Sequence, residues 1–533
     1  SLNLEASSIR RARRSVASLL DLSPQEATLL EEDAEGQEVK RSVPVSDVPS
    51  GARVLVLPGE RIPVDGVVSE GASAVDASTI TGESLPAEIG VGDKVYAGTM
   101  NHVGALEIQA SGNGSNTVLA GILSQVQEAQ LHRSRSERFV ERFARIYTSA
   151  VLVAALGTLF LAVYVFGETW HDSIYRSLVL LMIACPCALV ISTPVSVVCG
   201  LAAAARRGIL VKSGAILEQP ATVDCLALDK TGTLTLGRPQ VVSVHALGDH
   251  EEDEILSKAA CLERGATHPI AKAIVAGANA KNLNPERATS VQTLAGKGVE
   301  GCIAGKDHWL GSHRLLEERE QETSEVHKKI VELENEGASI VVVGNDAHAC
   351  GFIALKDEPR PEAKRAMKSL GTIGVGRVIM LTGDNEGTAR SIADRVGIEE
   401  VRAELLPAEK VQAVRELVDD HKAVAMVGDG INDAPALAHA SLGIAMGGVG
   451  TDVAIDTADI VVMSDDLTHL TWLVEHSRRV LSTIRVNVVS SLVVKGVVFY
   501  LAVSGFASLW GAILADMGIS LAVVANSLRL LRR

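Results

Sequence analysis

Four long apolar segments interrupt an otherwise charged chain, and they constrain its fold more than any other feature. They run from about 147 to 166, 177 to 203, 486 to 504 and 507 to 528. A membrane-spanning helix needs about 20 apolar residues, so each segment is long enough, or nearly so, to cross a bilayer. We therefore predict four membrane helices, paired as two hairpins with turns at residues 167–172 and near Gly505.

Basic residues gather at the outer ends of these segments, and the two hairpin turns carry almost none. The flanking basic residues are Arg138, Arg142, Arg145, Arg206, Arg207, Lys212, Arg478, Arg479, Arg485, Arg529, Arg532 and Arg533. Cytosolic loops of membrane proteins carry an excess of Lys and Arg. We therefore expect an integral protein of the cell or inner membrane whose soluble domains lie in the cytosol.

The composition also indicates soluble domains joined to a membrane part. Hydrophobic residues make up 47% of the 533 residues, yet charged residues still reach 22%. A net charge of −15 argues against a nucleic-acid partner, which would require a basic face. The 7 cysteines are scattered apart from Cys185 and Cys187, which suits a reducing cytosol rather than a disulfide framework. We expect the lipid membrane as partner and a monomeric protein.

A chain of this length is too long for one hydrophobic core, so several domains are expected. Residues 22–125 alternate short Val/Ile runs with Gly, Pro and Asp turns, which predicts a β-rich domain. Strand-like and helical patterns alternate beyond residue 213, as in a doubly wound α/β sheet. We divide the chain into a helical linker (1–21), the β-rich domain (22–125), a first membrane pair (126–212), an α/β domain in two parts (213–236 and 357–476) around an α+β insert (237–356), and a C-terminal membrane pair (477–533).

The strongest chemical motif is Asp229-Lys230-Thr231-Gly232-Thr233-Leu234-Thr235, directly after the apolar run 223–228. The carboxyl end of a parallel strand is where α/β sheets bind ligands. An aspartate there can attack the γ-phosphate of ATP and form an acyl phosphate. Lys230 and the hydroxyls of Thr231 and Thr233 can hold the transferring group. The bland alternative, a solvated acidic turn, is disfavoured because companion motifs follow in order.

Two further polar motifs follow strand-like runs. Thr382-Gly383-Asp384-Asn385 comes after the run 377–381, and Gly428-Asp429-Gly430-Ile431-Asn432-Asp433 comes after the run 423–427. Phosphoryl transfer needs Mg²⁺, which prefers oxygen ligands. The candidate Mg²⁺ ligands are Asp229, Thr231, Asp429 and Asp433, and the candidate catalytic residues are Asp229, Lys230, Thr231, Thr382, Asp384, Lys410 and Asn432. An isolated lysine such as Lys410 is more often a surface charge.

Cys185-Pro186-Cys187 lies within the second apolar segment. Proline removes a backbone hydrogen bond and frees carbonyls at membrane depth. Two thiols beside that break can bind a soft or borderline ion. Two small packing cysteines are the alternative.

Lys495 and Asp516 are ionisable residues within the third and fourth apolar segments. Such groups are costly in lipid and usually mark a transport path. Asp516 offers an oxygen ligand, which suits Zn²⁺ or Cd²⁺ better than Cu⁺. Lys495 cannot ligate while protonated, but it could pair with Asp516 when no metal is bound.

These motifs together resemble the heavy-metal-transporting P-type ATPases, over essentially the whole length of the chain. The resemblance implies ATP-driven export of Zn²⁺, and also of Cd²⁺ or Pb²⁺, through a phosphorylated Asp229. It makes the β-rich block the actuator domain, and in Thr81-Gly82-Glu83-Ser84 it assigns Glu83 to positioning the hydrolytic water. It implies a haloacid-dehalogenase-type phosphorylation domain with a nucleotide-binding insert, in which ATP contacts Glu263, His268, Gly296, Gly298, Thr382 and Gly383.

Within this family, Lys495 and Asp516 beside Cys185-Pro186-Cys187 resemble the pumps for zinc, cadmium and lead. Copper pumps tend to carry Tyr-Asn in the third span and Met with Ser-Ser in the fourth, whereas Gly518-Ile519-Ser520 follows Met517 here. A cobalt pump would be expected to have Ser in place of Cys185.

The sequence departs from the family's pattern at its start. Heavy-metal pumps usually have four more membrane helices ahead of the actuator domain and often a Cys-x-x-Cys metal-binding domain, and neither is present in these 533 residues. We expect the chain to begin in the linker that leads into the actuator domain, with preceding helices cut away. Two alternatives remain at this point: a membrane-anchored phosphatase of the dehalogenase class, and a non-transporting remnant.

Overall fold

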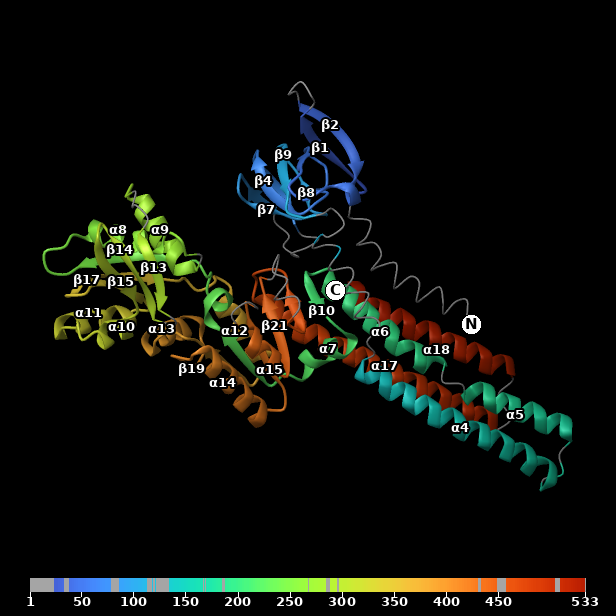
Figure 1. The fold of residues 1–533 in the computed structure, drawn as a ribbon. Helices are drawn as coiled ribbons and strands as arrows, with labels where there is room; N and C mark the ends of the chain where they lie inside the picture. Colours follow the sequence, from blue (N-terminus) through green and yellow to red (C-terminus); the bar gives the residue numbers. More distant parts are fainter. Residues whose placement is uncertain are drawn as a thin grey trace.

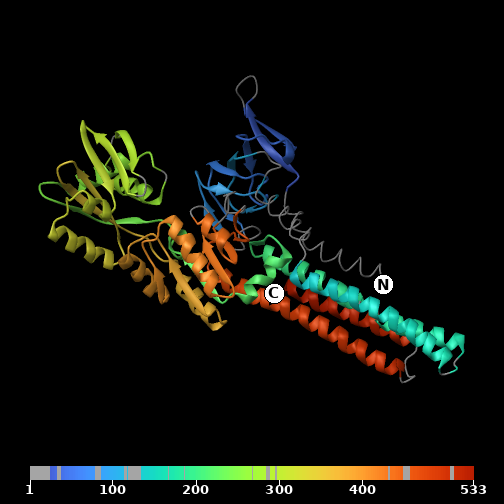
Figure 2. The same cartoon turned by 60° about the horizontal axis from the view of Figure 1, so that its bottom comes forward.

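The structure is a computed structural model with three soluble parts and a bundle of long helices (Figure 1). It describes residues 24–32, 38–77, 86–112, 117, 120, 134–165, 167, 169–184, 187–266, 268–283, 288–294, 297–429, 433–447, 457–503 and 509–532. The helical bundle extends from one side of the α/β domain, and the insert lies on the opposite side (Figures 1 and 2). The predicted combination of a helical membrane region, a β-rich domain and an α/β domain with an insert is confirmed.

The β-rich domain is built from two antiparallel sheets, ordered β2-β1-β3-β9-β4-β7 and β6-β5-β8. Its strands are β1 (Glu26–Glu32), β2 (Glu38–Pro44), β3 (Arg53–Val56), β4 (Gly66–Glu70), β5 (Ser73–Asp76), β6 (Ala87–Ile89), β7 (Lys94–Val95), β8 (Met100–Asn101) and β9 (Leu106–Ala110). Alternate residues of β3 and β9, such as Val54 and Ile108, are buried, because side chains alternate between the faces of a strand. Glu83 falls between β5 and β6, outside the described residues.

The α/β domain is a seven-stranded sheet ordered β10-β22-β21-β20-β11-β18-β19. Strand β11 is parallel to both β18 and β20, as the doubly wound pattern predicts. The strands are β10 (Ile209–Val211), β11 (Cys225–Asp229), β18 (Arg377–Leu381), β19 (Glu400–Arg402), β20 (Val424–Gly428), β21 (Leu442–Met446) and β22 (Ile460–Val462). The helices are α7 (Gly214–Glu218), α12 (Ala363–Thr372), α13 (Glu386–Val396), α14 (Pro407–Asp420) and α15 (Ala434–His439). All residues of β11, β20 and β21 are buried, since helices cover both faces,.

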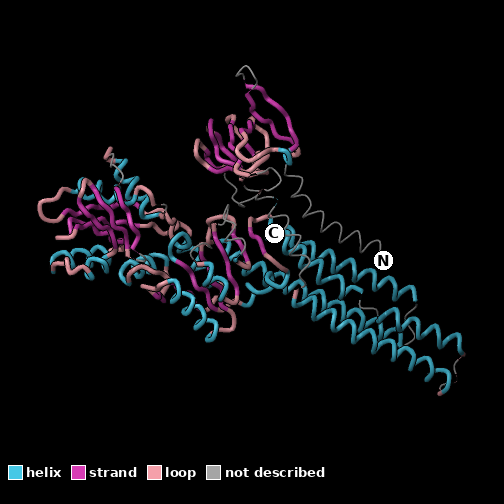
Figure 3. Tube along the Cα trace, viewed as in Figure 1, coloured by secondary structure: helices cyan, strands magenta, loops and turns pink. Residues whose placement is uncertain are grey.

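The insert is an antiparallel sheet ordered β12-β17-β16-β15-β14-β13, drawn in magenta between its helices in Figure 3. The strands are β12 (Gln240–Ala246), β13 (Thr289–Leu294), β14 (Gly298–Ile303), β15 (Lys306–Gly311), β16 (Ser339–Asn345) and β17 (Ala349–Lys356), and the helices are α8 (Glu252–Glu263), α9 (Pro269–Ala280), α10 (His313–Glu318) and α11 (Ser324–Asn335). Along β16, Val341 and Val343 face one core and Ile340 and Val342 face the other. The sheet is therefore buried on both faces, and each face has its own pair of helices.

The helical bundle contains α4 (Arg135–Tyr164), α5 (Trp170–Ala184), α6 (Cys187–Ala205), α17 (Thr468–Val503) and α18 (Leu509–Leu528). Among the described residues, four helices are long and apolar enough to cross a membrane, at 135–164, 188–205, 468–501 and 510–531. Large apolar side chains such as Val153, Phe160 and Val493 are exposed on these helices. They form an outer surface suited to lipid.

The membrane helices differ from the sequence prediction at two places. The second apolar segment is divided between α5, which ends at Ala184, and α6, which begins at Cys187. The first hairpin turn is shorter than predicted, because Thr169 caps α5: its hydroxyl accepts from the Asp172 amide at 3.2 Å and donates to the Asp172 carboxylate at 2.7 Å. A threonine at that position satisfies an otherwise unpaired amide and starts the helix early.

Candidate active site

Asp229 lies at the carboxyl end of β11 and is only 4% exposed. Strands β18 and β20 flank β11 and end beside it, so Thr382 and Asp429 follow at the same edge of the sheet. The three motifs that are far apart in sequence therefore meet at one edge, as the parallel arrangement predicts.

Lys410 reaches this edge from the first turn of α14. Its Nζ lies 2.5 Å from Asp229 Oδ1 and 3.0 Å from Asp433 Oδ1. Burial raises the pKa of Asp229 to about 7; Asp433 and Asp429 add to the rise, and Lys410 opposes it. Burial also works to lower the pKa of Lys410, but Asp229 and Asp433 outweigh it and raise that pKa. Lys410 is thus a half-buried charged partner of the site rather than a surface lysine.

Asp433 presents an oxygen suited to a metal ion. The side chain is 1% exposed, and its Oδ2 has no hydrogen-bond partner among the described residues. Gly428 leaves the space for this carboxylate, since a Cβ there would lie 2.6 Å from Asp433 Oδ2. A buried carboxylate oxygen without a donor is costly unless something else binds it. Asp433, with Asp229 and Asp429 beside it, therefore fits a Mg²⁺ site.

Lys230 is 5% exposed and forms an ion pair with Asp384. The amide of Asp384 in turn donates to Thr382 Oγ1 at 3.1 Å, and Thr382 is 2% exposed. Asn385, the last residue of that motif, caps α13 by accepting from the Thr388 amide at 2.8 Å. Lys230 is therefore tied to the β18 motif, whereas the Thr231 side chain is exposed.

The turn after Asp229 is held by residues that the sequence analysis did not single out. Gly232 has a φ of 76° there, which favours glycine. The buried Arg360 donates from Nε to the Thr233 carbonyl at 2.9 Å and from its terminal nitrogen to the Gly232 carbonyl at 2.8 Å. Asp357 accepts from Thr235 Oγ1 at 2.5 Å. The sequence feature that could have indicated Asp357 and Arg360 is the charged stretch 356–360, directly after the last strand of the insert.

In the insert, Glu263 ends α8 and is 3% exposed. Its Oε2 lies 3.3 Å from His268 Nε2. His268 caps α9, because its Nδ1 accepts from the Ala271 amide at 3.2 Å; its proton therefore sits on Nε2, facing Glu263. Gly298 begins β14 with a φ of 151°, and a Cβ there would lie 2.0 Å from the Leu310 carbonyl oxygen. Packing against β15 alone thus demands a glycine at this position.

Lys495 on α17 and Asp516 on α18 form an ion pair within the helical bundle. Lys495 Nζ lies 3.0 Å from Asp516 Oδ1, and the two side chains are 10% and 14% exposed. Apolar residues of the same helices, including Val494, Val498 and Ala512, line a small cavity around them. The structure therefore brings together the two charges that the sequence placed in separate spans.

A second polar group between the membrane helices was missed by the sequence analysis. Asn487 on α17 donates to Ser527 Oγ at 3.0 Å and accepts from Asn526 Nδ2 at 2.8 Å. Ser527 Oγ also lies 2.8 Å from Ser196 Oγ on α6. These bonds join α6, α17 and α18. The sequence pattern of one helix does not indicate which polar residues of another helix it will contact.

Some predicted residues lie outside the described part of the chain. They are Glu83, Cys185, Gly296 and Asn432. Cys187 begins α6, but its side chain is outside the described part.

Two family models match this chain. Residues 21–127 match the P-type ATPase actuator domain, and residues 223–441 match the haloacid dehalogenase-like hydrolases. An actuator domain, a phosphorylation-type α/β domain split by an insert, and helices long enough to span a membrane together define the class of P-type ATPases.

Individual relatives identify the subgroup of P-type ATPases to which this chain belongs. The chain is 40% identical over 99% of its length to a probable cadmium-transporting ATPase of Staphylococcus aureus strain MRSA252, of which it covers 73%. It is 41% identical, also over 99% of its length, to a zinc/cadmium/lead-transporting P-type ATPase of Escherichia coli K12, of which it covers 70%. A crystal structure of a zinc-transporting PIB-type ATPase in an E2.Pi state matches 99% of this chain and 86% of that one, with 39% identity and a TM-score of 0.62. The chain belongs to the heavy-metal-transporting P-type ATPases.

Proposed function

We propose that this protein uses ATP to export Zn²⁺ from the cytosol across a membrane, and that it also accepts Cd²⁺ and Pb²⁺. The observation that carries the chemistry is the buried Asp229 at the end of β11, 2.5 Å from Lys410. The names of the relatives support the choice of ions. A match that extends over the membrane helices favours a pump over a membrane-anchored phosphatase or a non-transporting remnant.

The first step is attack of an Asp229 carboxylate oxygen on the γ-phosphorus of ATP. A new O–P bond forms while the bond to the bridging oxygen breaks, and ADP leaves with that electron pair. Lys410, whose charge is maintained by the two neighbouring carboxylates, offsets the negative charge that gathers there,. Mg²⁺ held by Asp229, Asp429 and Asp433, with Thr231 beside them, would neutralise charge on the phosphate oxygens.

The second step hydrolyses the aspartyl phosphate. We propose that Glu83 accepts a proton from water while the water oxygen attacks phosphorus. The bond between phosphorus and the Asp229 oxygen then breaks, which releases phosphate and restores the carboxylate. Asp384, whose amide donates to Thr382, pairs with Lys230 at the neighbouring strand end. We propose that Asn432 and Gly383 complete the surroundings of the phosphoryl group. Glu263, His268, Gly296 and Gly298 would contact the nucleotide.

In the membrane, we propose that Cys185, Cys187 and Asp516 bind the transported ion. Two thiolates and a carboxylate suit Zn²⁺, Cd²⁺ or Pb²⁺ better than Cu⁺. Lys495 is the counter-charge that pairs with Asp516 when the ion has left, in the arrangement at 3.0 Å. A carboxylate left alone at membrane depth would be costly.

We further propose that the catalytic domains lie in the cytosol, on the side marked by the basic residues that flank the membrane helices. A monomer is sufficient, because one chain supplies both the groups around Asp229 and the Lys495–Asp516 pair.

The test is metal-dependent ATPase activity of the protein in lipid vesicles, with Zn²⁺, Cd²⁺, Pb²⁺, Cu⁺ and Co²⁺ compared. Stimulation by Zn²⁺, Cd²⁺ and Pb²⁺, and a phosphoenzyme that hydroxylamine cleaves, are expected. Asp229→Asn should abolish the phosphoenzyme. Stimulation by Cu⁺ and not by Zn²⁺ would overturn the choice of ion, and phosphatase activity without ATP-dependent phosphoenzyme would favour the anchored phosphatase.

A further inference from the structure

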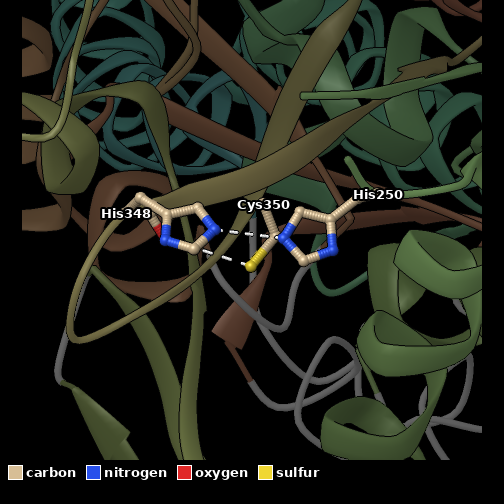
Figure 4. Close-up of side chains that lie close together, drawn as sticks. All are labelled: His250, His348 and Cys350. Carbon is tan, nitrogen blue, oxygen red and sulfur yellow. Dashed lines mark hydrogen bonds between the residues drawn. The ribbon is translucent and has the colours of Figure 1, made fainter. Parts of the chain in front are cut away.

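Two histidines and a cysteine of the insert lie close together (Figure 4). His250 precedes α8, His348 lies in the turn between β16 and β17, and Cys350 is on β17. The Nε2 atoms of the two histidines are 3.1 Å apart, and one ring nitrogen of each histidine lies within 4.8 Å of the Cys350 sulfur. We propose that this cluster is a second metal site, which takes a borderline or soft divalent cation such as Zn²⁺ or Cd²⁺.

The orientation of His250 supports this assignment. Its Nδ1 lies 3.1 Å from Glu254 Oε2, and Glu254 also pairs with Lys258 at 2.6 Å. A carboxylate only accepts hydrogen bonds, so Nδ1 carries a proton, and in the neutral imidazole Nε2 then presents its lone pair to the cluster. Histidine ligands in metal sites are usually fixed in this way by a carboxylate on the far nitrogen.

Asn345 holds the other two residues in place. Its Oδ1 accepts from the amides of Ala347 and His348 at 2.8 and 3.0 Å, and its Nδ2 lies 3.6 Å from the Cys350 sulfur. The Leu247 amide donates to the Cys350 carbonyl at 2.9 Å, which ties the loop before His250 to β17. These hydrogen bonds therefore hold the turn that presents His348 in one conformation.

The spacing suits a tetrahedral metal. Two nitrogens bound to zinc at about 2.0–2.1 Å lie roughly 3.3 Å apart in a tetrahedron, close to the 3.1 Å between the Nε2 atoms. Two imidazoles and a thiolate are ligands for Zn²⁺ and Cd²⁺ rather than for Mg²⁺. Three protein ligands leave a fourth position for water, so the ion should exchange with free metal in the cytosol rather than act as a permanent structural ion.

A second histidine cluster in the insert lacks these properties. His313 has Glu322 at 2.5 Å on Nε2 and Glu334 at 3.4 Å on Nδ1. Both of its nitrogens therefore face carboxylates, as expected for a protonated histidine in an ion-pair network. Only the His250 cluster, within the described residues, combines facing imidazole nitrogens with a thiol.

The position of the site connects it to the nucleotide region. His250 lies just before α8, and Glu263 ends the same helix. An ion on His250, His348 and Cys350 would fix the start of α8 to the β16–β17 turn. The cation would then stabilise the domain that we expect to bind ATP, by an amount that grows with the logarithm of the free metal concentration above the Kd.

The test uses the full chain in detergent, with Cys185→Ser, Cys187→Ser and Asp516→Asn to remove the proposed transport site. Zn²⁺ is titrated against a chelator, and Cd²⁺ is followed by thiolate-to-metal absorption. We expect one Zn²⁺ per chain to remain. His348→Gln should weaken it by about 100-fold, Glu254→Gln by about 10-fold to 100-fold, and Cys350→Ala should remove the thiolate absorption.

The controls distinguish the loss of a metal ligand from a disturbance of the domain's structure. His348 is exposed, so His348→Gln should not disturb the core, even if Cys350→Ala does. Cys302→Ser, on β14 of the same domain, should leave binding unchanged. The proposal is overturned if the background chain binds no Zn²⁺, if His348→Gln leaves the affinity unchanged, or if His313→Gln removes the ion instead. None of these outcomes depends on which ion is transported.

Discussion

At the scale of single residues, we propose that Lys410 decides whether Asp229 can work as a nucleophile. Two buried carboxylates face its ammonium group at 2.5 and 3.0 Å. Lys410→Met would leave both without that cation, and losing one partner of a buried ion pair costs roughly 3–5 kcal/mol. We expect phosphoenzyme formation from ATP to fall by about 100-fold or more, measured after acid quenching with labelled ATP.

The matched control is Lys422→Met, because Lys422 is exposed and close in sequence. It should leave the phosphoenzyme level unchanged. A Lys410→Met protein that is folded and phosphorylates at the normal rate would show that the lysine has no part in the reaction.

Gly428 offers a test of the metal position at the same scale. A Cβ there would lie 2.6 Å from Asp433 Oδ2 and 2.9 Å from Asp433 Cβ, so Gly428→Ala must displace that carboxylate. We expect the Mg²⁺ concentration needed for half-maximal phosphoenzyme to rise by about 10-fold or more. Gly371→Ala is the control, since nothing lies within 4 Å of a Cβ at Gly371. An unchanged Mg²⁺ dependence would rule out Asp433 as a ligand.

At the scale of elements, a histidine links α10 to α11. Hydrogen bonds to Glu334 and Glu322, opposed by burial, raise the pKa of His313 from 6.5 to about 9. The folded pKa exceeds the unfolded one, so this stabilisation is full below about pH 6.5 and is lost as pH rises through about 9. It corresponds to at most roughly 3 kcal/mol. His313→Gln should therefore speed amide exchange in α10 and α11 at about pH 6 and have little effect at about pH 10.

The comparison at each pH is with the unmodified protein, because intrinsic exchange also changes with pH. His102→Gln, at an exposed position in the β-rich domain, should leave α10 and α11 unaffected at both values. Equal effects of His313→Gln at both pH values would contradict the ion-pair account.

The elements around Asp229 were predictable because their signals are local. Buried strands read as unbroken apolar runs, and each run ends in a polar motif, so the meeting of Asp229, Thr382 and Asp429 followed from the fold class. The Lys495–Asp516 pair was predictable because charges in apolar spans need partners.

Other contacts depend on packing that no local pattern encodes. Arg360 binds the carbonyls of Thr233 and Gly232 across 127 and 128 residues of sequence, respectively. Asn487 and Ser527 join three helices through their side chains. From the sequence alone, the same polar residues could equally be predicted to face solvent. The early start of α5 depended on one side-chain cap at Thr169, which a search for apolar runs overlooks.

At the scale of the whole molecule, α17 connects the α/β domain, which carries Asp229, to the Lys495–Asp516 pair in the helical bundle. Its first turns, with Leu470 and Leu473, belong to the same core as Met367 and Leu370 of α12. The same helix continues without interruption from Thr468 to Val503 and carries Lys495 in its membrane part. We propose that a displacement of the α/β domain would be passed along this continuous helix to Lys495.

Substitutions of Lys495 and of Asp516 should affect transport in different ways. We propose that Asp516 is an ion ligand, so Asp516→Ala should abolish both metal binding at the transport site and metal-stimulated ATPase, while phosphorylation by inorganic phosphate persists. We propose that Lys495, 3.0 Å from Asp516, competes with the ion for that carboxylate, so Lys495→Met should remove only the competitor. The ion should then bind at least as tightly but leave slowly, which lowers steady-state turnover by about 10-fold or more. Bound Zn²⁺ per chain and ATPase rate, measured on the same vesicles, distinguish the two. If Lys495→Met abolished binding as Asp516→Ala does, the lysine would be a structural support of the site and not the charge that displaces the ion.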